Sequence, residues 1–268
     1  PADKGWLIRV YLPKATAVSA FSVTDDKFLG EMTADAEITG LFSLVLARKR
    51  QTEPYYLQVQ QGQHQYKLID PYQFKDEAFF AVHYVNMQPE NLYRQLGAQL
   101  VTLSLGKGVV QATRFAVYAP HASSVSLIGD FNDWDGRCHP MERTACGHWV
   151  LVLPEVAAGV RYKFEIKDAA GDLLPHKADP MAFAAEQYPS HASLVYDHHQ
   201  YQWQDSVWQQ RSHTPYQSPM SVYELHAGSW RTHADGRPLT YPELAAQLIP
   251  YIKDLGYTHI ELMPVMEH

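Results

Sequence analysis

The sequence is poor in cysteine, in long apolar runs and in positive charge, and each shortage excludes a class of protein. Only two cysteines, Cys138 and Cys146, occur in 268 residues. They could pair across a turn, but without a secretory signal at the N-terminus we expect two free thiols in a cytoplasmic protein. No apolar run approaches the ~18 residues of a membrane helix, so we expect no membrane partner. The net charge of −7 disfavours nucleic acid and anionic lipid as partners.

Metal-binding patterns are missing as well. The 14 histidines are scattered apart from the adjacent pair His198-His199, and neither HExxH nor CxxC spacing occurs. Asp130, Asp133 and Asp135 lie close together, but they lack the glycine and the closing glutamate of an EF-hand loop. We interpret these aspartates as turn-forming residues and expect neither a metal nor a cofactor.

Aromatic residues, in contrast, are plentiful at 12% of the chain, with 17 tyrosines and 6 tryptophans. This content is typical of a β-rich core and also suits a protein that binds sugars. The stretch Gly129–Met141 follows a predicted strand at 124–128 and carries Phe131 and Trp134 among Asn, Asp and Arg residues. It is either an ordinary turn or a carbohydrate-binding edge, because ring faces stack on sugars while polar side chains bond their hydroxyls.

The chain contains an internal repeat. The matching segments are 8–19 with 115–126, 40–46 with 147–153, and 70–71 with 179–180. The first two pairs share one offset, since 115 minus 8 and 147 minus 40 both give 107. We interpret them as two copies of one domain of roughly a hundred residues. Only the second copy has the Phe-Asn-x-Trp loop, so only this copy is expected to bind sugar by that route.

Both copies alternate apolar and polar residues in the manner of β-strands. In the stretch Arg161–Lys167 the alternation is strict, and this period of two places every second side chain on a buried face. The residues predicted to be buried are Tyr162, Phe164 and Ile166 here, and Trp149, Leu151 and Leu153 in a half-buried strand before it. Several short strands separated by turn residues predict a β-sandwich for each copy.

The last fifty residues change from strand to helix periodicity and back. A short buried strand is predicted at 220–226. Thr240 and the glutamate three residues later form a capping box, and apolar residues then recur at helical spacing until Gly256 supplies the C-terminal cap. Pro250 is expected to kink this helix. A second strand is predicted at 257–264, so the segment predicts a βαβ unit with parallel strands.

These features resemble the N-terminal region of bacterial glycogen branching enzymes, members of the α-amylase superfamily. The segments 115–120, 129–137, 139–141, 162–165 and 178–180 resemble a family-48 carbohydrate-binding module. The segments 223–230 and 261–268 resemble the first two strands of the family's catalytic (β/α)₈ barrel, and 96–98 resembles the junction between the sandwiches. The likeness covers nearly the whole chain.

The predicted fold is therefore mostly β: two tandem immunoglobulin-like β-sandwiches followed by the first β-α-β of a truncated (β/α)₈ barrel. The predicted divisions are 1–105 for the first sandwich, 106–200 for the carbohydrate-binding-module-like sandwich, 201–219 for a linker and 220–268 for the incomplete barrel. We expect a longer parent chain, because the sequence opens on Pro1 in place of Met and stops after the second barrel strand. Uncovered strand faces in the barrel fragment predict self-association.

The resemblance implies the N-terminal portion of an enzyme that cuts α-1,4-glucan chains and re-attaches them through α-1,6 bonds. The mechanism is retaining, with an Asp nucleophile and a Glu acid/base. Both are expected beyond His268, so no catalytic residue maps onto this chain, and the chain alone is expected to be inactive. Glycogen or another α-1,4-glucan is the implied partner. Two alternatives stay open: a glucan-binding module pair without catalysis, and another superfamily member such as a debranching enzyme or trehalohydrolase.

Two residues are candidates for contact with glucan. Trp134 offers a platform for a glucose ring, and Lys163 matches a lysine that contacts sugar in related modules. The simpler interpretations are an aromatic that plugs the loop and a solvated strand lysine. Where glycogen-binding modules have a second aromatic, in the hairpin after the Tyr-Lys-Phe strand, this sequence has Asp172-Leu173-Leu174.

Overall fold

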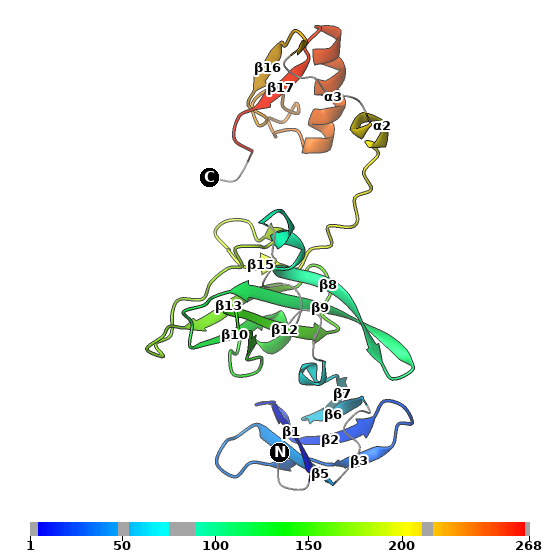
Figure 1. Cartoon of the computed structure of the whole chain (residues 1–268), viewed down its shortest axis with the longest axis vertical. Helices are drawn as coiled ribbons and strands as arrows, with labels where there is room; N and C mark the ends of the chain where they lie inside the picture. Colours follow the sequence, from blue (N-terminus) through cyan, green and yellow to red (C-terminus); the bar gives the residue numbers. More distant parts are fainter. Residues whose placement is uncertain (1–4, 48–53, 75–88, 211–216, 266–268) are drawn as a thin grey trace. The chain divides into compact units, whose positions relative to one another are not determined.

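The protein is known from a computed structural model, which describes residues 5–47, 54–74, 89–210 and 217–265. The chain forms two compact units, residues 1–201 and residues 202–268. The first unit holds two β-sandwiches and the second holds a small α/β element (Figure 1). The mostly β fold with a C-terminal β-α-β element confirms the predicted fold class.

Seven strands form the first sandwich in the part of the chain that the structure describes. They are β1 (Gly5–Tyr11), β2 (Ala17–Ser22), β3 (Phe28–Glu31), β4 (Thr33–Ala34), β5 (Leu41–Ala47), β6 (Tyr55–Gln61) and β7 (His64–Leu68). One sheet has the order β1-β5-β4 and the other the order β3-β2-β6-β7, and the pairs are antiparallel. The strands alternate, so that Val18, Ala20, Leu57 and Val59 face the core between the sheets and are almost fully buried.

The second sandwich repeats this plan with additions. Its strands are β8 (Gly97–Leu105), β9 (Gly108–Tyr118), β10 (Ser124–Gly129), β11 (Glu142–Arg143), β12 (His148–Pro154), β13 (Arg161–Lys167), β14 (Ala184–Ala185) and β15 (Ser193–Leu194). The sheets have the orders β11-β12-β9-β8 and β10-β13-β15-β14. β8 pairs with β9 along its whole length, so this sheet begins at Gly97, within the range predicted for the first domain.

Equivalent strands of the two sandwiches fall at equivalent places in the chain. β2 and β10 start at Ala17 and Ser124, and β5 and β12 start at Leu41 and His148. The differences, 124 minus 17 and 148 minus 41, both give the repeat offset of 107. The sheet β4-β5-β1 of the first sandwich corresponds to β11-β12-β9 of the second. The second sandwich has an extra strand, β8, on the free side of β9.

A buried tyrosine-aspartate pair recurs in both copies. In the first, the Tyr55 hydroxyl donates to the Asp70 carboxylate, which also accepts the backbone N–H of Tyr72. In the second, the Tyr162 hydroxyl donates to Asp179 Oδ2 at 2.7 Å, and the same carboxylate accepts the next-but-one backbone N–H at 2.8 Å. Asp70 and Asp179 are the first residues of the repeated Asp-Pro dipeptides. Each tyrosine-aspartate pair therefore links its strand, β6 or β13, to the later segment that begins with this dipeptide.

A glycine turn is shared as well. Gly40 and Gly147 precede β5 and β12 with φ of +88° and +83°, a region that side chains other than glycine rarely adopt. A Cβ atom at either position would lie 2.5 Å from the Cα of Pro13 or 2.8 Å from the Cα of Pro120. Both the backbone conformation and the close approach therefore require glycine here.

Strand β12 is buried on both faces, whereas its sequence predicts a half-buried strand. The predicted face packs in the main core, through Trp149, Leu151 and Leu153. The other face is covered because Val150 packs with Leu96 next to the short helix η2 (Pro89–Arg94). The 3₁₀ turn η1 (Pro71–Gln73) of the first sandwich also contacts β12. The cover comes from segments distant in sequence, which a strand's own periodicity does not reveal.

The second unit contains the predicted parallel pair. β16 (Val222–Leu225) and β17 (His259–Leu262) are parallel neighbours, and helix α3 (Tyr241–Asp254) connects them. The capping box forms, since Glu243 accepts the N–H of Thr240 at 2.8 Å, and Gly256 follows the helix with φ of +78°. The predicted linker contains a short helix, α2 (Ser206–Gln209).

Buried leucines hold α3 against β16, and the other strand has little cover. Leu244, Leu248 and Ile252 of the helix pack with Leu225. All four residues of β17 are exposed, Ile260 and Leu262 among them. Among the described residues, no helix is long and apolar enough to cross a membrane. Self-association through this fragment stays a prediction.

Candidate glucan-binding surface and inter-sandwich cleft

The stretch from Gly129 to Met141, here called the 129–141 loop, is a tightly hydrogen-bonded turn. It starts with the 3₁₀ turn η3 (Asp130–Asn132), after which Asp133 and Trp134 both adopt left-handed conformations, with φ of +54° and +62°. The Trp134 N–H donates back to Gly129 O at 3.1 Å. Two successive non-glycine residues in this region cost energy, so the surrounding contacts must hold the turn in place.

Asn132 provides the central contact of the loop. Its side chain is buried, and its Oδ1 accepts the Gly129 N–H at 2.9 Å. Its Nδ2 lies 2.9 Å from both Leu127 O and His139 Nδ1. One amide therefore ties the end of β10 to both ends of the turn, which explains the Asn in the Phe-Asn-x-Trp sequence.

Trp134 is tied to a charged pair beside the turn. Arg161 of β13 donates two hydrogen bonds to the Asp130 carboxylate, from Nε and from Nη2, each at 3.0 Å. These hydrogen bonds from Arg161, with a smaller one from the Trp134 side chain, lower the pKa of the Asp130 carboxyl. The indole is half-buried. Trp134 thus has a fixed position, and part of its surface is exposed.

Lys163 lies at the same end of the β10–β13 pair. It is half-buried and stands opposite Ile128, whose side chain is fully buried. Gly136 lies directly against the side chain of Glu165. Glu165 is two residues after Lys163 on β13, so the two side chains are on the same face of the strand. The 129–141 loop therefore covers part of the face that carries Lys163. A role of Trp134 and Lys163 in glucan binding remains a prediction.

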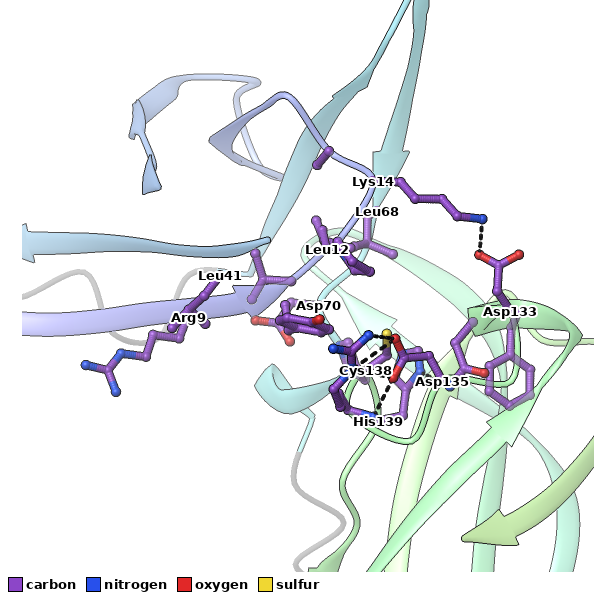
Figure 2. A pocket seen from close by; sticks show the side chains of 18 of the residues that line it. Arg9, Leu12, Lys14, Leu41, Leu68, Asp70, Asp133, Asp135, Cys138 and His139 are labelled. Atoms are coloured by element: carbon purple, nitrogen blue, oxygen red, sulfur yellow. Dashed lines mark hydrogen bonds and ion pairs between the residues drawn. The ribbon is translucent and has the colours of Figure 1, made fainter. Parts of the chain in front are cut away.

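The opposite side of the same loop lines a cleft against the first sandwich (Figure 2). This inter-sandwich cleft has a volume of about 420 Å³. Its walls include Arg9, Tyr11, Lys14, Tyr66, Asp70 and Tyr72 from the first sandwich, and Asp133, Asp135, Arg137, Cys138 and His139 from the second. The sequence of the loop predicts a ligand only at the face with Trp134, and it gives no sign of the cleft.

Contacts between described residues join the sandwiches around the cleft. Lys14 Nζ lies 2.7 Å from Asp133 Oδ2, and the Tyr72 hydroxyl donates to Pro140 O at 2.9 Å. The Arg137 guanidinium lies over the Tyr11 ring at 5.0 Å from its centroid, in a cation–π contact. Lys14 and Asp133 are 119 residues apart, so no spacing in the sequence points to their pairing.

Burial controls the titration of the groups at the floor of the cleft. It lowers the pKa of His139 to about 4, so the imidazole is neutral near pH 7. It raises the pKa of the Cys138 thiol to about 11, where the thiol is a poor nucleophile. Cys138 and Cys146 are both free. Among the described residues, no three His, Cys, Asp or Glu side chains gather as a metal ion would require.

Two family models match the chain, and together they define its class. The model for Carbohydrate-binding module 48 (Isoamylase N-terminal domain) matches residues 95–182, the second sandwich. The model for the N-terminal domain of the alpha-1,4-glucan branching enzyme GlgB matches residues 1–72, the first sandwich. The first unit is thus a GlgB-type N-terminal domain followed by a family-48 module.

Curated relatives extend the likeness over the whole chain. The 1,4-alpha-glucan branching enzyme GlgB of Pseudoalteromonas atlantica is 50% identical over 99% of this chain and 37% of its own length. That of Vibrio cholerae is 46% identical over 100% of this chain and 36% of its own. The chain corresponds to the N-terminal portion of these GlgB proteins and spans about a third of their length.

Solved structures are more distant. A pullulanase type I from Bacillus subtilis complexed with maltose is 18% identical, with a TM-score of 0.44, over 100% of this chain and 37% of its own.

Proposed function

We propose that this chain is the glucan-binding N-terminal region of a 1,4-alpha-glucan branching enzyme. The observation that carries the proposal is the similarity to curated branching enzymes along the entire chain. The match of the second sandwich to a carbohydrate-binding module supports an α-glucan as the ligand. Trp134 and Lys163 are the proposed contacts, because they lie at one end of the β10–β13 pair with part of their surface open.

The binding function is tested by affinity electrophoresis of the chain in gels that contain glycogen. The wild type is expected to be retarded, and Trp134→Ala is expected to lose most of the retardation because the ring face is gone. Trp203→Ala is the matched control, since Trp203 is 77% exposed in the other unit. Wild-type mobility equal to that in a glycogen-free gel would refute glucan binding by this chain.

The catalytic function of the parent protein is proposed on the same similarity. It transfers α-1,4-glucan segments to α-1,6 positions with retention, through two carboxylates about 5–5.5 Å apart. The chain by itself is proposed to be inactive, because the described residues of its second unit form two parallel strands and a barrel active site draws on the loops of eight. Product analysis on amylose tests this: the parent should add α-1,6 linkages without releasing sugar, and the chain alone should add none. Release of sugar would indicate a debranching enzyme.

A further inference from the structure

We propose that the inter-sandwich cleft is a second α-glucan site, distinct from the Trp134 face, in which a glucan chain stacks on Tyr66. The proposal rests on the proposed function, since it takes the same ligand class. It differs in location, because Tyr66 belongs to the first sandwich, which has no counterpart of the Phe-Asn-x-Trp loop.

The size and lining of the cleft suit a sugar chain. A volume of about 420 Å³ lies within the range of small-molecule sites, about 300–1,000 Å³. The walls combine apolar side chains such as Leu12, Leu41 and Leu68 with hydroxyl, amide and charged groups. A glucose unit needs this combination, because its CH faces are apolar and its hydroxyls require hydrogen-bond partners.

The charges around the cleft balance, which favours a neutral ligand. The lining has three basic residues, Arg9, Lys14 and Arg137, and three acidic residues, Asp70, Asp133 and Asp135. Lys14 pairs with Asp133 (Figure 2), and Arg137 pairs with Asp135 at 2.7 Å. A phosphorylated sugar or a nucleotide would meet no excess of positive charge here. An uncharged glucan needs none.

Tyr66 is the ring best placed to stack on the sugar. One face of Tyr11 is taken by Arg137, and the Tyr72 hydroxyl is bonded to Pro140. Tyr66 lies on β7 at the wall of the cleft and is 40% exposed. Burial, with a smaller effect from Asp133, raises the pKa of Tyr66, so its hydroxyl keeps its proton and can donate to a sugar oxygen.

Calorimetric titration of the full chain with maltoheptaose tests the site. Tyr66→Ala is expected to weaken binding about tenfold at the cleft. Tyr66→Phe is expected to keep most of the affinity, because the ring remains. Tyr93→Ala is the matched control, since Tyr93 is also 40% exposed but lies on η2 outside the cleft. Each single change is repeated in the Trp134→Ala background, where only the cleft would bind.

The outcomes separate this proposal from the proposed function. Loss of the residual binding of Trp134→Ala when Tyr66 is also replaced supports the cleft. Binding by Tyr66→Ala that equals that of Tyr93→Ala overturns the cleft and leaves the glucan-binding function intact. No binding by the wild type overturns both. A second readout needs no variant: maltoheptaose should slow amide hydrogen exchange in β7 (His64–Leu68), and unchanged exchange there contradicts the proposal.

Discussion

The replacement Asn132→Ala should destabilise the second sandwich far more than an average surface substitution. The change removes the hydrogen bonds of Asn132 to Gly129 N–H, Leu127 O and the His139 ring. Leu127 and Gly129 are buried, so their backbone groups would be left without partners inside the fold. The left-handed turn that follows would lose its anchor as well.

The size of the destabilisation follows from the two backbone groups that lose their partner, Gly129 N–H and Leu127 O. A buried donor or acceptor without a partner costs about 1–3 kcal/mol. Two such groups give about 2–6 kcal/mol, and water entering the vacated space should keep the loss near 3 kcal/mol. A loss of this size is a large fraction of the 5–15 kcal/mol that stabilises a typical domain.

Native-state hydrogen exchange followed by mass spectrometry is the suitable assay, because a chain with several domains has no single unfolding midpoint. Peptides from β12 and β13 report the second sandwich, and peptides from β2 and β6 report the first within the same sample. We expect about 3 kcal/mol less protection in β12 and β13 and little change in β2 and β6. Protection in β12 and β13 within about 1 kcal/mol of wild type would refute the anchoring role of Asn132.

Three further predictions concern stability. Tyr162→Phe should cost about 1–3 kcal/mol because it leaves the buried Asp179 carboxylate without its hydroxyl donor; protection in β13 like that of wild type would contradict this. Stability of the second sandwich should fall as pH drops from about 6.5 to about 4, because burial lowers the pKa of His139 to about 4 and the unfolded chain takes up the proton first; hydrogen exchange of β12 and β13 peptides at stepped pH checks this, and His139→Gln should reduce the dependence while the similarly lowered pKa of His148 keeps part of it. Gly147→Ala should lower hydrogen-exchange protection in β12 and β13 more than Gly159→Ala; both glycines have positive φ, but a Cβ at Gly159 meets nothing within 4 Å, and equal losses would exclude a clash at Gly147.

Local patterns in the sequence predict the local structure well. The alternation in 161–167 places Tyr162 and Phe164 in the core, as observed, and the capping box at Thr240 marks the start of α3. Hydrophobic period and cap chemistry are properties of neighbouring residues, so the sequence carries them directly. The 107-residue offset similarly predicts which strands are equivalent.

Features made by distant segments are not visible in the sequence. The double burial of β12 depends on cover from η1 and η2, and the inter-sandwich cleft depends on pairs such as Lys14 with Asp133. The 129–141 loop suggests a sugar-binding edge because Trp134 and its polar neighbours have that chemistry. The other side of the loop has ordinary turn residues, and only the folded chain brings the first sandwich against them.

The extra strand β8 has a consequence for how two related halves fold in one polypeptide. Neighbouring domains of the same plan can exchange strands and become trapped in misassembled states. In the second sandwich, β8 forms nine consecutive residue pairs with β9. These pairs occupy the edge of β9 to which a strand of the other sandwich would otherwise bind. In the first half, β1 is the terminal strand of its sheet among the described residues, with Trp6 and Leu7 exposed. A product in which the two sandwiches exchange strands should therefore form through β1 and leave the carbohydrate-binding-module half correctly paired.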